Sequence, residues 1–342
     1  MKKIRILALI MALMMIIASF AGCAGTKTNE ESTTEATEAE SISTEKATVN
    51  VSLLKGPTGM GGAYMWTKAD NNETRNNYNI TLDTDATTVG PKLMKGEYDI
   101  AAIPTNLAAS LYQKSEGKVK VIAVNTLGVL YIVTKNNAIS SVADLKGKTI
   151  LASGQGTIAE YALNYVLEEN GYVIGQDVTV EFSTEHAESV TKAIAGGYDA
   201  VLLPEPFVSQ ICTKDASFSV AINITEEWEK AGDCTLTMGC VAVNAAFYEK
   251  NKQAVADFLK DYAESVDYVN SNTEDAAALI ESHDIMAAAV AKKAIPNANI
   301  VCYTGAEMKD ALSGCYKVLF EQNAKIIGGQ MPDDAFYIEA IA

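Results

Sequence analysis

The hydrophobic and polar positions of the chain follow one pattern twice, over residues 92–104 and 192–204. Each copy has the end of an amphipathic helix, a Gly, a Tyr-Asp pair, a short apolar run and a Pro. A short apolar run between turn signals is typical of a buried strand, and Pro suits the first turn of the next helix. The pattern therefore predicts a repeated helix, turn and strand unit.

The similarity continues upstream, where residues 79–82 and 177–180 both read as strands. Before each of them lie a further strand, a Gly-rich loop and a helix. This order predicts an α/β fold of two lobes, each a largely parallel sheet flanked by helices. Ligands of such sheets gather outside the carboxyl ends of the strands. We therefore expect the ligand site in a cleft between facing lobes.

The first 22 residues read as an export signal, with a basic start and an apolar run over residues 6–20. That run is short for a bilayer span, which needs about 20 apolar residues. It ends before Cys23 in a small-residue pattern that resembles the bacterial lipobox. We expect a lipid on Cys23 to anchor the chain at the extracytoplasmic face of the cell membrane. An ordinary signal peptide or an uncleaved apolar helix is the alternative.

The composition divides the rest of the chain. Residues 23–47 are rich in Thr, Ser, Glu and Ala and predict a disordered tether. Residues 48–342 exceed what one core usually supports, which agrees with two lobes. A net charge of −16 argues against nucleic acid as a partner. The scattered cysteines favour core thiols, although a disulfide, for example between Cys212 and Cys234, stays open.

Residues 142–150, with the core Asp-Leu-Lys-Gly-Lys, and the following Gly154-Gln155-Gly156-Thr157 resemble a signature of the type II periplasmic binding proteins. The chain is most similar to the group with sulfonate, nitrate and thiamin-pyrimidine receptors, over residues 48–270. This resemblance implies a first lobe of residues 48–130 and 244–342 and a second lobe of residues 131–243. Residues 128–135 and 236–244 would be the hinge strands.

Two Gly-rich loops, residues 55–62 and 154–157, each follow a strand and open a helix, so their amides can face a ligand. Neither has the spacing of a phosphate-binding or dinucleotide-binding loop. A plain capped turn is the alternative for the second loop. The ligand-binding residues that we expect around the two loops are Thr58, Met60, Gly61, Tyr64, Gln155, Gly156, Thr157 and Tyr161.

The ends of the third strands add Thr105 and Asn106 in one repeat and Glu205 and Phe207 in the other. Glu205 lies between two prolines, where the chain is stiff, and could accept a hydrogen bond from a ligand. The alternative is a carboxylate at a helix start, which the helix dipole favours. The aromatic candidates can stack on a planar ligand, or they can belong to the core.

Arg75 is the only arginine of residues 48–342, which disfavours a guanidinium clamp on an anion. We therefore expect an uncharged or cationic ligand, heteroaromatic ones included, although helix N-termini alone can bind anions. The sequence predicts no catalytic residue, no metal site and no cofactor.

The predicted function is a monomeric solute receptor that delivers its ligand to the permease of an ABC importer. Two alternatives stay open: an exported sensor lipoprotein without transport, and an enzyme similar to the thiamin-pyrimidine synthases or the chorismate dehydratases. Export of the chain and the presence of only two histidines, His186 and His283, argue against the enzymes.

Overall fold

The computed structural model describes residues 46–340. The signal peptide, Cys23 and nearly all of the predicted tether lie outside the described residues, so those predictions remain predictions. No helix of residues 46–340 is long and apolar enough to cross a membrane.

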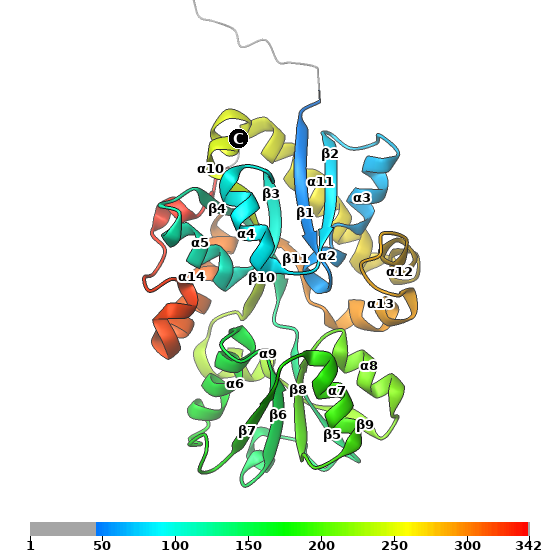
Figure 1. Ribbon diagram of the computed structural model, residues 1–342, viewed down its shortest axis with the longest axis vertical. Coiled ribbons are helices and arrows are strands. Elements are labelled where there is room, and N and C mark those ends of the chain that lie inside the picture. Colours follow the sequence, from blue (N-terminus) through cyan, green and yellow to red (C-terminus); the bar gives the residue numbers. More distant parts are fainter. Residues whose placement is uncertain (1–45, 341–342) are drawn as a thin grey trace, which may run out of the picture. The chain divides into compact units, whose positions relative to one another are not determined.

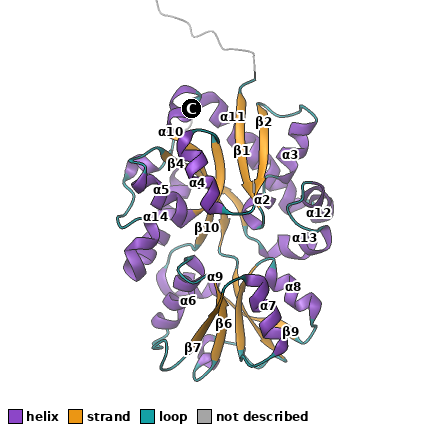
Figure 2. Cartoon of the chain, in the orientation of Figure 1, coloured by secondary structure: helices purple, strands orange, loops and turns teal. Residues whose placement is uncertain are grey.

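The described chain forms two separate β-sheets with helices packed on them (Figures 1 and 2). The strands of the first sheet, in spatial order, are β11 (Ile300–Tyr303), β4 (Val119–Leu127), β10 (Thr237–Asn244), β3 (Ile100–Pro104), β1 (Thr48–Leu54) and β2 (Asn77–Asp83). Those of the second sheet are β7 (Thr179–Ser183), β6 (Thr149–Ser153), β8 (Ala200–Pro204), β5 (Leu130–Lys135) and β9 (Phe218–Asn223). This two-lobed α/β architecture confirms the predicted fold class, but the sheets are mixed and not largely parallel. The strand β10 pairs antiparallel with β3 and β4, β11 pairs antiparallel with β4, and β5 pairs antiparallel with β8 and β9.

Each of the two sheets has its own set of helices. Those of the first lobe are α2 (Pro57–Met60), α3 (Ala63–Asp70), α4 (Ala86–Lys95), α5 (Thr105–Lys114), α10 (Ala245–Lys250), α11 (Lys252–Ser271), α12 (Thr273–Ser282), α13 (Ala288–Ala294) and α14 (Gly305–Asn323). Those of the second lobe are α6 (Ile158–Glu169), α7 (His186–Ala195), α8 (Phe207–Lys214) and α9 (Ile224–Gly232). Short 3₁₀ turns are η1 (Val142–Leu145), η2 (Ile295–Asn297), η3 (Ala324–Ile327) and η4 (Asp334–Phe336).

The sequence repeat corresponds to α4–β3 in the first lobe and α7–β8 in the second, and its Tyr-Asp pair has the same task in both. Oδ2 of Asp99 accepts a hydrogen bond from the backbone N–H of Asn50 at 2.8 Å. Oδ2 of Asp199 accepts one from the N–H of Thr149, also at 2.8 Å. Each carboxylate therefore fixes the last strand of its repeat against the first strand of that repeat, β3 against β1 and β8 against β6, and both pairs are parallel.

Two short segments carry the chain from one sheet to the other. Gly128 and Val129 join β4 to β5, and residues 233–236 lead from α9 to β10. All of β5 pairs within the second sheet, whereas all of β10 pairs with β3 and β4 of the first. The resemblance assigns residues 237–243 to a hinge strand that is counted with the second lobe. The register moves this boundary to about residue 236.

Apolar side chains are buried on both faces of the sheets, as the helices on both sides require. In β3, Ile100 and Ala102 face one cluster, while Ala101 and Ile103 face another. This alternation follows from the two-residue period of a strand. The larger cluster continues from the first lobe into the second, where it includes Trp228 of α9. The two lobes therefore share part of one core.

Candidate functional site

The strand register makes the carboxyl ends of the central strands of the two lobes face each other. Pro104, at the end of β3, pairs with Gly239 near the start of β10. The start of β10 is where the chain returns from the second lobe to the first. Pro204, at the end of β8, pairs with Leu130 at the start of β5. The start of β5 is where the chain passes from the first lobe to the second. Because the crossing segments are short, both strand ends lie at the boundary between the lobes. Figure 1 shows β1 running toward the same boundary and ending at α2.

The first Gly-rich loop folds tightly back on β1. A Cβ atom on Gly59 would lie 2.0 Å from the backbone oxygen of Leu54, so only glycine fits there. Gly56 has φ of +103°, a conformation that favours glycine. The backbone oxygen of Thr58 accepts a hydrogen bond from Nδ2 of Asn125 at 3.1 Å. The fold thus holds Thr58, which is partly exposed, at the end of β1.

The other three candidates of this loop point into the first lobe. Met60 is fully buried in its core. The backbone oxygen of Gly61 accepts a hydrogen bond from Oγ of Ser265 at 2.6 Å. Tyr64 stacks on Tyr268 of α11, with ring centroids 3.9 Å apart. The structure therefore places Met60, Gly61 and Tyr64 against α11 and the core, and not with the strand-end residues.

The second Gly-rich loop caps α6 and leaves its polar residues exposed. Oγ1 of Thr157 accepts a hydrogen bond from the N–H of Ala159 at 3.3 Å, as a helix cap does. The N–H of Gly156 donates to Oε2 of Glu160 at 2.5 Å. Gln155, Gly156 and Thr157 are exposed. An anionic ligand at this loop would meet the carboxylate of Glu160 at the Gly156 amide.

At the third strand ends, Thr105 and Glu205 are both buried. Oγ1 of Thr105 donates to the backbone oxygen of Thr237 at 3.0 Å, which fastens the end of β3 to β10. Asn106, the next residue, is partly exposed. Thr105 thus has a structural partner already, and Asn106 is the more accessible of the two.

Glu205 is only 2% exposed, and its carboxylate is bound by the first turn of α8. Oε1 accepts a hydrogen bond from Oγ of Ser209 at 3.0 Å, and Oε2 accepts one from the N–H of Ser209 at 3.2 Å. Burial raises the pKa of Glu205 despite these hydrogen bonds. Among the described residues, no Lys, Arg or His forms an ion pair with it. Glu205 is therefore a buried carboxylate without a counter-charge.

Phe207 and Tyr161, the two aromatic candidates of the second lobe, lie on different helices. Phe207 begins α8, and its ring lies 5.1 Å from that of His186, centroid to centroid. The hydroxyl of Tyr161 accepts a hydrogen bond from Nδ2 of Asn323 at 2.6 Å, which joins α6 to α14 of the first lobe. Tyr161 thus connects the lobes, while Phe207 lies beside the strand-end residues.

The sequence did not single out a further pair at the strand ends, Ser153 and His186. Ser153 ends β6, His186 begins α7, and the Ser153 Oγ and His186 Nδ1 atoms are 2.5 Å apart. Burial lowers the pKa of His186, so the ring is neutral at pH 7. The position of Ser153 directly before the Gly-rich loop was the signal that could have identified it.

Charged side chains of both signs lie near the strand ends, and Asp83 there is paired with Lys92 at 3.6 Å. Arg75 lies before β2, at the opposite end of the sheet, and forms ion pairs of 2.6 Å with both Asp261 and Glu264. Near the carboxyl ends, Asp83 and Glu185 accompany Glu205, and Lys55 follows β1. The arginine is thus engaged far from the facing strand ends.

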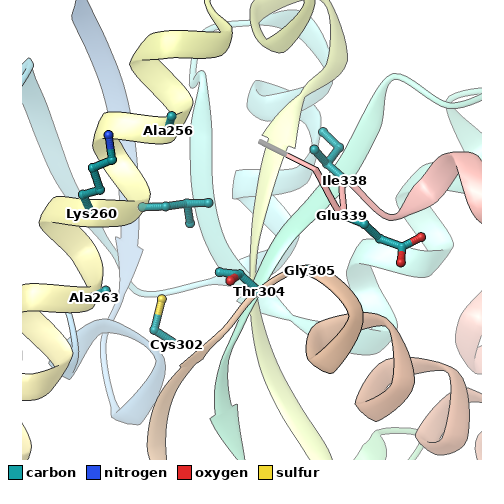
Figure 3. A pocket seen from close by; sticks show the side chains of 9 residues that line it. Ala256, Lys260, Ala263, Cys302, Thr304, Gly305, Ile338 and Glu339 are labelled. Carbon is teal, nitrogen blue, oxygen red and sulfur yellow. The ribbon is translucent and has the colours of Figure 1, made fainter. Parts of the chain in front are cut away.

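A hollow of about 350 Å³ lies elsewhere, within the first lobe (Figure 3). None of the predicted site residues lines it. Its lining residues come from α11, β11, the start of α14 and the segment after η4: Ala256, Leu259, Lys260, Ala263, Cys302, Thr304, Gly305, Ile338 and Glu339. Within residues 46–340, no group of three metal-ligating side chains is present, and the cysteines are free thiols.

Solved structures of binding proteins resemble this fold. An ABC transporter from Parabacteroides distasonis is 23% identical, covers 86% of this chain and 99% of its own, and has a TM-score of 0.73. The periplasmic aliphatic sulphonate binding protein SsuA from Escherichia coli is 17% identical, with coverages of 86% and 95% and a TM-score of 0.68. The periplasmic nitrate-binding protein NrtA from Synechocystis PCC 6803 is 13% identical, with 81% of each chain covered and a TM-score of 0.56.

No curated protein matches the sequence. Residues 71–295, well over half of the chain, match the family model described as ABC transporter, phosphonate, periplasmic substrate-binding protein. This match agrees with the two facing lobes and with the resemblance carried by residues 142–157. The chain therefore belongs to this family of periplasmic substrate-binding proteins of ABC transporters.

Proposed function

We propose that this substrate-binding component of an ABC importer captures an uncharged or cationic small molecule between its lobes and delivers it to a permease. The observation that carries the proposal is the buried, unpaired carboxylate of Glu205 at the boundary between the lobes. A buried charge is costly unless it is paired. A ligand amine or ring N–H would supply the missing partner.

The remaining strand-end groups support the same ligand class. Gln155 and Asn106 offer neutral donors and acceptors, and the Ser153–His186 pair is uncharged at pH 7. The Gly156 N–H, which could otherwise bind an anion, already donates a hydrogen bond to Glu160. Thr58, Thr157 and Phe207 complete the proposed site, with Phe207 as the ring that can stack on a planar ligand.

The family description names phosphonate, which is an anion, so the ligand class has a direct test. A thermal-shift screen would compare amines, pyrimidines and flavins with alkylphosphonates and sulfonates, and titration calorimetry would measure the dissociation constant of each hit. We expect the tightest hit to be uncharged or cationic. If a phosphonate or sulfonate binds most tightly, the proposed ligand class is wrong, although the receptor function is not.

We further propose that the chain binds its ligand without transforming it. Ser153 and His186 resemble a nucleophile and its base, but in the described residues no carboxylate accepts a hydrogen bond from His186. Incubation with each hit, followed by mass spectrometry of the small molecule, should recover it unchanged. A transformed product would favour the enzyme alternative.

The mature protein is proposed to be a monomer anchored by a lipid on Cys23, with residues 23–47 as the tether. The basic start, apolar run and small residues before Cys23 support this anchoring. A sensor without transport is the alternative. Uptake of the identified ligand by cells with and without the gene would separate a transport receptor from a sensor.

A further inference from the structure

The end of α14, a helix of the first lobe, packs on α6 of the second lobe (Figure 1). Nδ2 of Asn323, the last residue of α14, donates to the hydroxyl oxygen of Tyr161 at 2.6 Å. Nε2 of Gln322 donates to Oε2 of Glu168, also at 2.6 Å. These two side-chain hydrogen bonds join the lobes in addition to the two covalent crossings.

The first lobe holds the side chain of Asn323 in place. Its Oδ1 atom accepts a hydrogen bond from the N–H of Lys325 at 3.1 Å and so caps η3. Only the oxygen of an amide side chain can accept from an N–H, which leaves the nitrogen for Tyr161. The hydroxyl of Tyr316 on α14 donates to the backbone oxygen of Thr105 at 2.8 Å and so fixes α14 to the start of α5. The donor for Tyr161 therefore has a fixed position on the first lobe.

The acceptors on the second lobe lie along one face of α6. Tyr161, Tyr165 and Glu168 have the spacing i, i+4, i+7 of a single helix face. Tyr165 packs on Trp228 of α9, with ring centroids 4.7 Å apart. The helix begins directly after the second Gly-rich loop, residues 154–157, and Tyr161 lies at the end of its first turn. A contact that holds Tyr161 therefore also holds this loop.

We propose that Asn323 is a positioning residue, which holds α6, and with it the second Gly-rich loop, against the first lobe in the ligand-free protein. The hydrogen bond from Asn323 to Tyr161 is partly buried, whereas that from Gln322 to Glu168 is exposed. Water can replace an exposed partner, so the bond of Asn323 contributes more to the contact. This role rests on the proposed function only in that the loop belongs to the ligand site, and it can be tested without a ligand.

A native thiol reports on the contact between α14 and the second lobe. Cys234 is partly buried and lies in the crossing between α9 and β10. The helix α14 covers it closely, because a Cβ atom on Gly314 would lie 2.9 Å from the Cβ atom of Cys234. When α14 separates from α6, the rate at which iodoacetamide alkylates Cys234 should therefore rise. Peptide mass spectrometry measures this rate.

Two further thiols serve as references in the same sample. Cys212 is partly buried on α8 of the second lobe, and its rate corrects for the activity of the reagent. Cys240 is fully buried in β10, so its alkylation reports unfolding of the whole protein. A local separation of α14 from α6 raises the Cys234/Cys212 ratio and leaves Cys240 protected.

Tyr161→Phe removes only the hydroxyl that accepts from Asn323. It is expected to raise the Cys234/Cys212 ratio about fivefold, the effect of losing roughly one net hydrogen bond. Tyr172→Phe is the matched control, because the hydroxyl of Tyr172 forms its hydrogen bond within the second lobe. It should leave the ratio unchanged.

Three results would overturn the proposal. The first is a wild-type ratio in Tyr161→Phe, and the second is an equal rise in Tyr172→Phe. The third is alkylation of Cys240 that increases in parallel with that of Cys234, since this would show a general loss of stability and not a local separation.

Two substitutions of Asn323 separate its contact with Tyr161 from its cap of η3. Asn323→Ala removes both, so it should raise the Cys234/Cys212 ratio at least as much as Tyr161→Phe does. Asn323→Asp keeps one oxygen for the N–H of Lys325 and another that can accept from the Tyr161 hydroxyl, so the ratio should stay near the wild-type value. It should rise when Asn323→Asp is combined with Tyr161→Phe. A ratio as high in Asn323→Asp as in Asn323→Ala, or a wild-type ratio in the double variant, contradicts the assigned contact.

Discussion

At the scale of single residues, Glu205 holds two tasks that a substitution can separate. Its carboxylate binds the first turn of α8 through Ser209, and it lies at the boundary between the lobes without a counter-charge. The first task stabilises the fold, and the second is the proposed ligand contact. Gln keeps the shape and one acceptor oxygen but removes the charge, so it affects mainly the second.

Glu205→Gln should weaken ligand binding by about 1.5–3 kcal/mol, the range for hydrogen bonds to charged groups. This corresponds to about tenfold to a hundredfold in affinity. Titration calorimetry with a hit of the screen measures it. Glu188→Gln is the control, because that exposed carboxylate bonds Lys192 on the same lobe. If Glu205 only starts α8, its loss should cost about 0.3–1 kcal/mol of stability and leave the dissociation constant unchanged.

Some candidate residues could be placed from the sequence better than others, because strand ends are easier to recognise than the buried side of a short helix. A strand end is visible in the hydrophobic pattern, which led to Thr105, Asn106 and Glu205. The side of a short helix that faces the core is not visible in this way. Met60 and Tyr64 therefore counted as site residues, although Met60 is fully buried in the core and Tyr64 stacks on Tyr268 of α11.

At the scale of secondary-structure elements, the repeated Tyr-Asp turn explains why α4–β3 and α7–β8 could be recognised from the sequence. The same carboxylate fixes a strand in both lobes, so the same short pattern recurs. The two copies differ in burial. Asp99 is 9% exposed, whereas the side chain of Asp199 is 41% exposed and lies near Lys148.

This difference predicts unequal costs for the same substitution. Asp99→Ala should lower the free energy of unfolding by about 1–3 kcal/mol, because a backbone donor of Asn50 loses its partner in a buried place. Asp199→Ala should cost less, because water can replace the carboxylate at Thr149. Denaturant unfolding of the two variants tests this order, and a larger loss in Asp199→Ala would show that burial does not set the cost.

The hinge strands were placed less accurately than the repeat. Both β5 and β10 are apolar and buried, and such strands look alike whichever sheet they join. Only the pairing of Thr237 with Leu127, and of Gly239 with Pro104, assigns β10 to the first sheet. Pairing between segments far apart in the sequence is not encoded in the local pattern, so the boundary was displaced.

In the segment Gly128–Val129, which joins β4 to β5, we predict that a side chain at Gly128 would clash with its neighbours. A Cβ atom there would lie 2.1 Å from Oγ1 and 2.8 Å from Cγ2 of Thr225. Gly128→Ala should therefore destabilise the protein by about 1–3 kcal/mol, the usual cost of overpacking. In the double variant with Thr225→Ala, part of this loss should return, because two of the clashing atoms are removed. If the losses of stability of Gly128→Ala and Thr225→Ala simply add up in the thermal melts of the double variant, a clash with Thr225 is not the cause.

At the scale of the whole molecule, the proposed lipid anchor would decide where the receptor works. Cys23 is expected to be the lipidated N-terminus of the mature protein. Mass spectrometry of membrane-extracted protein should find a diacylated cysteine, and Cys23→Ala should release the chain from the membrane fraction. Retention of residues 1–22, or an unmodified N-terminus in the wild type, would contradict the anchor.

The pairing of Leu127 with Thr237 determines where a segment of the chain can be removed. Because these residues are neighbours across adjacent antiparallel strands, β4 and β10 form the two arms of a β-hairpin, and residues 128–236 stand where its turn would be. The second lobe is in this sense a domain inserted into a hairpin, with all five of its strands inside the insertion. A two-residue Asn-Gly turn in place of residues 128–236 would join the arms in the geometry that such turns favour. The molecule thus consists of a host domain and a guest domain, each with a complete sheet, and excision of the guest would expose the part of the core that the two share.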